Sequence, residues 1–89
     1  MLALFTTNMK TIYKYVITRR PIEIHTNAVI LHVDLQDQSY CLWALVDTTN
    51  PVEQRQFDVV GTGWDYEDNM HYVGTILENA FVWHIVEIK

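Results

Sequence analysis

The sequence predicts an all-β fold: a single small antiparallel sandwich or partly closed barrel of six or seven strands. The chain has 89 residues, of which 49% are hydrophobic, enough for one compact core and too few residues for two. Apolar and polar side chains alternate with a period of two along most of the chain, as they do in half-buried strands. No segment of ten or more residues carries a helical apolar stripe.

Residues 9–89 form the predicted single β domain, and residues 1–8 are interpreted as an N-terminal extension or as a strand added to it. The apolar run Met1–Phe5 has no basic segment before it, so no secretion signal is expected. The longest apolar runs are far shorter than the roughly 20 residues that cross a bilayer. A lone cysteine, Cys41, excludes internal disulfides and indicates a reducing compartment. We therefore expect a cytoplasmic protein without membrane contact.

The first half of the chain predicts four strands. Alternating side chains indicate strands at residues 11–17, 22–25 and 28–35, and Pro21 interrupts the first ladder. Residues 40–47 are apolar on both faces, which predicts a strand at the centre of the sheet with Trp43 in the core. In the third strand we expect one aliphatic face, made of Val29, Leu31, Val33 and Leu35.

The second half predicts three further strands. Residues 54–60 place Phe57 on an inward face, and residues 71–77 and 80–88 flank a tight turn. Trp83 lies in an apolar run and is expected in the core. Because edge strands of small open sheets tend to pair, we expect a homodimer, with residues 80–88 as the candidate edge.

The formal charge of −5 is unevenly distributed. Residues 1–55 carry five positive and five negative side chains, whereas residues 56–89 carry six carboxylates and one lysine. Lys and Arg supply most of the affinity for phosphate backbones, so the composition argues against general nucleic-acid binding. The acidic segment is interpreted either as a means of solubility or as a patch for a positively charged partner.

The strongest indication of binding is an aromatic and acidic stretch after the Gly-Thr-Gly turn. Aromatic rings mixed with carboxylates can grip an Arg- or Lys-rich surface through cation–π contacts and ion pairs. The alternative is that Trp64 folds back as a plug over the end of the sheet. The predicted partner-binding residues are Trp64, Asp65, Tyr66, Glu67 and Asp68.

A second hypothesis is a nucleotide site. Exposed N–H groups of the turn Gly61, Thr62 and Gly63 could cradle an anion, and Arg19 or Arg20 could supply positive charge. A Gly-Thr-Gly turn with no helix after it is a weak signal of anion binding and is more typical of a tight turn or a β-bulge. In this hypothesis the protein is an oligomer that captures a small nucleotide.

Catalysis and metal binding have little support in the sequence. The histidines His25, His32, His71 and His84 lack the spacing of paired metal ligands. His32 and His84 have apolar neighbours and are expected in the core or an interface. Ser39 lies in a predicted turn, and Cys41 is expected to be a buried structural residue. We therefore predict no metal, no cofactor and no enzymatic activity.

Six segments carry a recognisable pattern: Lys10-x-Ile12-x-Lys14-Tyr15, Ile30–Val33, Leu42–Asp47, Gly61–Gly63, Tyr72-x-Gly74-Thr75 and Phe81–His84. Together they resemble a family of small domains of unknown function found chiefly in bacteriophage and prophage genomes. The resemblance covers about residues 9–87 and supplies no catalytic residues. Relatives often carry His-Pro where this chain has Trp64-Asp65. The resemblance implies a phage accessory protein acting in the host cytoplasm, which inhibits an anti-phage defence complex such as a CRISPR effector or sequesters a defence nucleotide.

Overall fold

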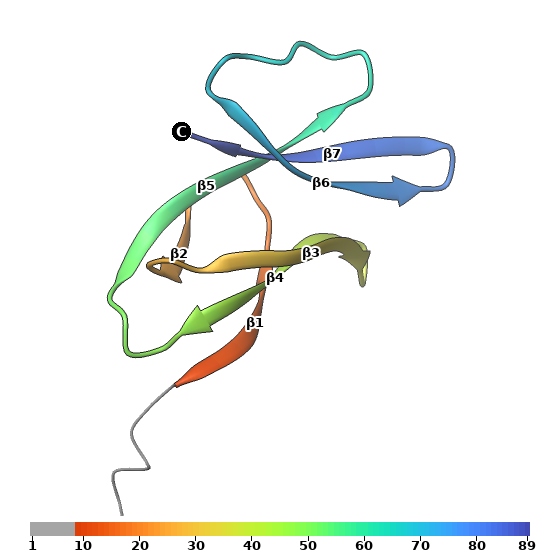
Figure 1. Ribbon diagram of the computed structural model, residues 1–89. Coiled ribbons are helices and arrows are strands. Elements are labelled where there is room, and N and C mark those ends of the chain that lie inside the picture. The colour runs from red at the N-terminus through yellow and green to blue at the C-terminus, as the bar shows by residue number, and fades with distance from the viewer. Residues whose placement is uncertain (1–8) are drawn as a thin grey trace, which may run out of the picture.

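A computed structural model describes residues 9–89, which form seven β-strands and no helix (Figure 1). The strands are β1 (Lys10–Val16), β2 (Ile22–His25), β3 (Val29–Gln36), β4 (Ser39–Asp47), β5 (Val52–Gly61), β6 (Met70–Glu78) and β7 (Phe81–Ile88). Each predicted strand is confirmed, with its ends shifted by at most two residues. The prediction for residues 1–8 lies outside the described residues. Within residues 9–89 no helix has the length and hydrophobicity that a membrane crossing requires.

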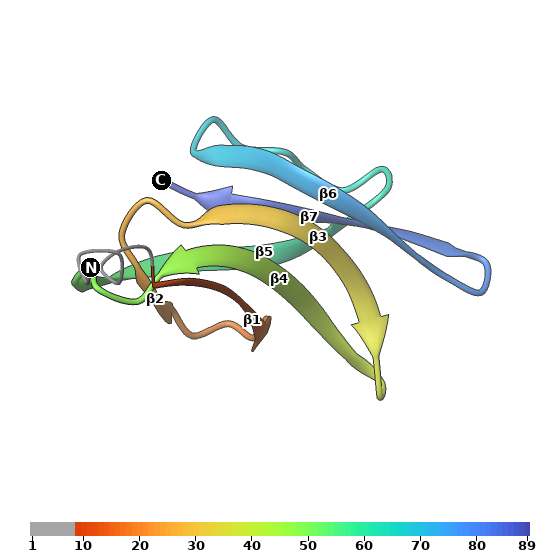
Figure 2. The same ribbon diagram turned by 60° about the horizontal axis from the view of Figure 1, so that its bottom comes forward.

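The strands make two antiparallel sheets that face each other as a sandwich. One sheet has the order β1-β4-β3, and the other has the order β2-β5-β7-β6. Figure 2 shows β3 running beside β6, where one side of the sandwich is closed by contact between the sheets. The two sheets do not join into a closed barrel. The predicted central position of residues 40–47 is confirmed, since β4 has a neighbour on each side.

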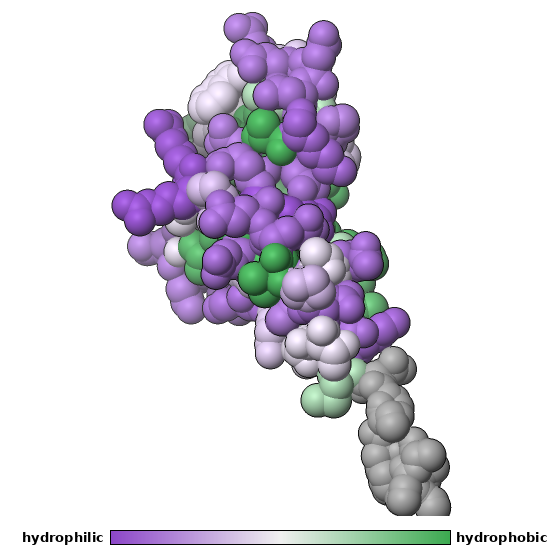
Figure 3. Space-filling view, turned by 90° about the vertical axis from the view of Figure 1, so that its left-hand side faces the viewer, coloured by the Kyte–Doolittle hydropathy of each residue, from purple (hydrophilic) through white to green (hydrophobic). Residues whose placement is uncertain are grey.

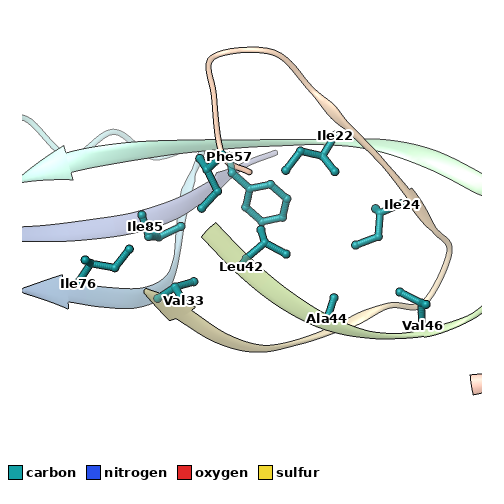
Figure 4. Packing of buried hydrophobic residues seen from close by; sticks show 10 residues of the cluster. Ile22, Ile24, Val33, Leu42, Ala44, Val46, Phe57, Ile76 and Ile85 are labelled. Atoms are coloured by element: carbon teal, nitrogen blue, oxygen red, sulfur yellow. The ribbon is translucent and has the colours of Figure 1, made fainter. Parts of the chain in front are cut away.

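The core lies between the two sheets. Phe57 of β5 is fully buried, and Figure 4 shows its ring between Leu42 of one sheet and Ile22 of the other. Burying a side chain of this size contributes roughly 1.5–3 kcal/mol. The buried cluster is Ile17, Ile22, Ile24, Val33, Leu42, Ala44, Val46, Phe57, Ile76 and Ile85.

The aliphatic face predicted for the third strand is wrong for its first half. A register shift between Ile30 and His32 leaves Leu31 as an extra residue in β3. Such a bulge reverses the alternation, so Ile30 packs against the core while Val29 and Leu31 are about half exposed. Sequence periodicity does not reveal a one-residue bulge here, because the strand with the bulge and the strand without it would both place apolar residues inward.

The expectation that residues 80–88 form a sheet edge is also wrong. β7 lies between β5 and β6, with Val59 and Gly74 both opposite Ile85. The long strand β5 pairs with β2 along its first half and with β7 along its second half. Because β6 pairs with the other side of β7, β7 is an interior strand. Among residues 9–89, the outermost strands of the two sheets are β1 and β3 in one sheet and β2 and β6 in the other.

Trp43 is not a core residue. It lies between Lys14 and His32 on the outer face of β4, because its neighbours Leu42 and Ala44 take the two fully buried inner positions. Its ring is half-buried, with its centroid 5.7 Å from that of His32. The apolar run of residues 40–47 therefore predicted a central strand correctly. It did not predict which of its side chains the opposite sheet covers.

Candidate functional site

The predicted partner-binding residues lie in the loop between β5 and β6, which arches away from the sandwich in Figure 1. All five residues of Trp64–Asp68 are exposed, Trp64 by 61% and Tyr66 by 55%. Within residues 9–89 none of the three loop carboxylates forms an ion pair. The loop thus presents two rings and three unneutralised carboxylates to solvent.

Backbone hydrogen bonds hold both ends of this loop. Trp64 N–H donates to the Gly61 carbonyl at 3.0 Å, and Gly63 takes the left-handed φ of 90° that this turn requires. At the other end, Met70 N–H donates to the Glu67 carbonyl at 3.0 Å. Lys89 N–H donates to the Asn69 carbonyl at 2.9 Å. The loop is anchored at its start and at its end.

Trp64 is exposed but its ring is held in place. Its indole meets the Trp83 ring edge-on, with centroids 5.7 Å apart and planes at 74°. On another side the indole rests on Gly61, where a Cβ atom would come within 2.7 Å of Trp64 Cε2. Only glycine allows this approach, so the turn fixes both the backbone and the ring.

Trp83 is the centre of a group of rings that we call the aromatic cluster: Tyr40, Trp64, Phe81 and Trp83. Phe81 stacks on Trp83 with centroids 5.6 Å apart, and Tyr40 meets it edge-on at 6.3 Å. Trp83, which was expected in the core, is partly buried and packs against the core cluster, while Phe81 is 59% exposed. The cluster connects the exposed loop to the inside of the sandwich.

The carboxylate of Glu78 organises the cluster. Its Oε1 accepts a hydrogen bond from Tyr40 Oη at 2.7 Å and another from Trp83 Nε1 at 2.9 Å. The hydrogen bond to Glu78, assisted by burial, raises the pKa of Tyr40 above its ordinary value. One carboxylate thereby orients two rings from different sheets. No sequence signal predicted this contact, because Glu78 lies 38 residues from Tyr40.

Exposed apolar side chains also occur on the opposite face of the β6–β7 hairpin, because successive strand residues point to opposite faces. Leu77 is 70% exposed and Val82 38% exposed, and they lie opposite each other in the ladder. A cavity of about 470 Å³ lies between the loop and the start of β7, lined by Gly61, Thr62, Trp64, Ala80, Phe81, Val82 and Trp83. The side of the molecule in Figure 3 is mostly hydrophilic, with scattered apolar residues.

The residues of the nucleotide hypothesis are split between two cavities. Arg19 lines a cavity of about 280 Å³ whose other lining residues include Tyr40, Asp58, Trp64 and Trp83. Gly61 and Thr62 line the larger cavity described above, and Trp64 borders both. Arg20 is exposed, and its backbone N–H donates to Thr18 Oγ1 at 3.1 Å. The arginines and the glycine turn therefore do not converge on one pocket.

The glycine turn also uses some of its polar groups internally. Thr62 Oγ1 donates to the Val82 carbonyl at 3.2 Å and lies 2.9 Å from His84 Nε2. The Trp64 N–H, which would be one donor of an anion cradle, is taken by the Gly61 carbonyl. The indole covers one side of Gly61.

Neither His32 nor His84 lies in the core. The His32 side chain is 63% exposed, with Nε2 3.5 Å from Asp34 Oδ2. His84 lies partly exposed between Thr62 and Thr75. Cys41 is buried, as expected, and its Sγ is 3.5 Å from the Ser39 carbonyl. Within residues 9–89, no three His, Cys, Asp or Glu side chains are arranged to hold a metal ion.

The sequence analysis missed a buried ion pair between β5 and β7. Arg55 donates from Nε and Nη2 to the two carboxylate oxygens of Glu87, at 2.7 and 2.8 Å, and from Nη1 to the Ala28 carbonyl at 3.1 Å. Hydrogen bonds from Arg55 lower the pKa of Glu87 and raise that of Arg55. The sequence did contain one indication of this ion pair: Arg55 is two residues from Phe57, a core residue, and so shares its strand face.

Comparison with known proteins identifies a family. A family model described as Domain of unknown function (DUF7352) matches residues 9–89. The chain belongs to this family, which covers all the described strands. No curated protein and no solved structure matches the chain.

Proposed function

We propose that this protein is a non-catalytic binding protein that contacts a partner with a basic surface through Trp64–Asp68. The observation that carries the proposal is an exposed tryptophan fixed against Gly61 and Trp83. It stands at the start of a loop with three carboxylates that form no ion pair within residues 9–89. Phe81, which is 59% exposed and stacks on Trp83, extends the surface.

The physical support is preorganisation. A ring that is already held in its position loses little conformational freedom when it enters a partner's pocket, and tryptophan is enriched among residues that dominate binding energy. In the part of the chain that the structure describes, the loop carboxylates have no ion pair that would have to break before they meet Arg or Lys. Their charge speeds encounter with a basic partner and makes the rate depend on salt.

The resemblance to phage and prophage domains supports a finer proposal. In it the protein is a phage accessory protein in the cytoplasm of the host, and its partner is a protein of an anti-phage defence complex such as a CRISPR effector. The protein inhibits that complex by occupying a basic surface. The fold itself carries no information on this point.

The test is affinity capture from phage-infected cells with the tagged wild type and a variant carrying Trp64→Ala, Asp65→Ala and Tyr66→Ala. We expect a companion protein that the wild type retains and the triple variant loses. A control with Val52→Ala and Glu53→Ala removes an exposed apolar side chain and a carboxylate at the start of β5. The proposal fails if the triple variant keeps the native circular dichroism spectrum and all companions of the wild type.

A second candidate function is nucleotide binding by an oligomer. Its support is that Arg19 lines the same cavity as the rings of Trp64 and Trp83, so a base could stack while the guanidinium meets a phosphate. A panel of linear and cyclic nucleotides tests it by thermal shift. A rise in melting temperature that Arg19→Ala abolishes supports this function, and no shift with any nucleotide rejects it.

A further inference from the structure

Among residues 9–89, β1 is an edge strand, and no described strand pairs with the backbone groups on its outer side. Its register with β4 is regular over all seven residues, without a bulge. Thr48 N–H donates to the Met9 carbonyl and Ile17 N–H donates to the Tyr40 carbonyl. In an antiparallel ladder, hydrogen-bonded pairs alternate along the strand, so residues in odd positions turn their backbone groups toward β4. The backbone groups of Lys10, Ile12, Lys14 and Val16 therefore point to the open edge.

This edge has little protection against pairing. It contains no proline or glycine, and six of its seven residues are exposed. Ile12 is 56%, Tyr13 43% and Val16 47% exposed, so apolar surface flanks the edge on both faces of the sheet. Two lysines are its only charges, and Lys14 Nζ is engaged by Gln36 Oε1 at 2.7 Å. A regular, exposed strand of this kind is a template for another strand.

We propose that a second copy of this chain pairs with β1, antiparallel and about a twofold axis at Tyr13. Hydrogen bonds between the two β1 strands form only when residues whose backbone groups point to the open edge lie opposite each other. The allowed registers therefore differ by steps of two residues. With the axis at Tyr13, Ile12 lies opposite Lys14 of the partner subunit and Lys10 lies opposite Val16 of the partner subunit. A register displaced one step places Lys10 opposite Lys14, and displaced the other way it places Lys14 opposite Lys14.

The central register is thus the one that separates like charges and keeps the full seven-residue overlap. It also places the two Tyr13 rings beside each other as a non-hydrogen-bonded pair, the closer type of cross-strand contact. The outcome is one six-stranded sheet made from two β1-β4-β3 sheets. The loop Trp64–Asp68 follows a strand of the other sheet and stays free.

Sedimentation velocity of the full chain with a matched pair of charge variants tests the register. Ile12→Lys places two lysines opposite Lys14 of the partner subunit in each dimer, whereas Ile12→Glu places two ion pairs there. We expect the wild type and Ile12→Glu to be dimers, and Ile12→Lys to dimerise about tenfold or more weakly than Ile12→Glu. Equal weakening by both variants, or a wild type that stays monomeric at the highest attainable concentration, overturns the proposal.

Cross-linking gives an independent readout. In the proposed register the two copies of Tyr13 lie directly opposite each other at the twofold axis, with Cα atoms about 4.5 Å apart, within the range that a disulfide spans. Tyr13→Cys alone is expected to form a covalent dimer on mild oxidation. The control Thr11→Cys faces Tyr15 of the partner subunit and is expected to stay uncross-linked, as is the wild type with its buried Cys41. Equal cross-linking of Thr11→Cys and Tyr13→Cys contradicts the proposed axis.

Discussion

The indole of Trp64 rests on the backbone of Gly61, so close that a Cβ atom on Gly61 would lie 2.7 Å from Trp64 Cε2. The contact joins the end of β5 to the first exposed ring of the candidate surface. Because Gly61 is itself buried and paired with Trp83 in the ladder, the ring position depends on the sheet rather than on the loop alone.

Gly61→Ala is predicted to displace the Trp64 ring. The added methyl group overpacks the contact and lowers the free energy of unfolding by about 1–2 kcal/mol. Urea denaturation measures the loss, and near-ultraviolet circular dichroism reports the ring's new environment. In a Trp64→Ala background the same substitution should cost almost nothing, because the colliding atoms are gone. An equal loss in both backgrounds contradicts the contact.

Glu78→Ala is predicted to disorder the aromatic cluster. It removes the acceptor shared by Tyr40 and Trp83, and leaving two part-buried donors unpaired costs about 1–3 kcal/mol. Glu78→Gln is the matched control, since its amide oxygen can still accept. The pKa of Tyr40 should fall toward the ordinary value in Glu78→Ala, as read from tyrosinate absorbance. An unchanged titration of Tyr40 would show that Glu78 does not hold it.

Acid is predicted to destabilise the protein through Glu87. Its folded pKa is lowered, chiefly by the Arg55 hydrogen bonds, so its contribution is complete above the unfolded value near 4.5. That contribution is lost as the pH falls through the folded pKa. Breaking the pair with Glu87→Gln should cost about 3 kcal/mol at neutral pH. The variant's unfolding free energy should also change less between neutral and acidic pH; parallel pH profiles for the two proteins would refute this.

Gly74→Ala is predicted to push the two sheets apart where β3 meets β6. A Cβ atom at Gly74 would lie 2.5 Å from Val33 Cγ2, a core side chain that cannot swing into solvent. Overpacking here should cost about 1–3 kcal/mol, measured by thermal or urea unfolding. Val33→Ala by itself should lower stability, but in the double variant with Gly74→Ala it should relieve the collision. Simple additivity of the two losses would argue against close contact.

Local patterning was enough to predict the strands, whereas pairing required the structure. The apolar run of β4 correctly predicted a central strand, since both of its faces are apolar. The position of β7 was missed, because strand neighbours depend on which hairpins meet and not on the strand's own residues. The bulge at Leu31 was missed for a similar reason, since a one-residue insertion preserves the apolar content of the strand.

At the candidate site, the sequence predicted which residues gather in the loop but not what fixes them. Trp64 and Tyr66 stood out because they occur among carboxylates and glycines, where burial in a small chain is hard to achieve. The contacts of Trp64 with Trp83 and of Glu78 with Tyr40 join separate strands. Such contacts follow from register and sheet packing, which a single sequence does not encode in any local pattern.

The most direct test of the central proposal is the affinity of the captured companion for the wild type and for Trp64→Ala, measured by titration calorimetry. If Trp64 is the fixed anchor of the surface, its truncation should weaken binding about 30-fold or more, corresponding to at least 2 kcal/mol. The control Val52→Ala should bind like the wild type. A Trp64→Ala variant that folds normally and binds within twofold of the wild type would contradict the account.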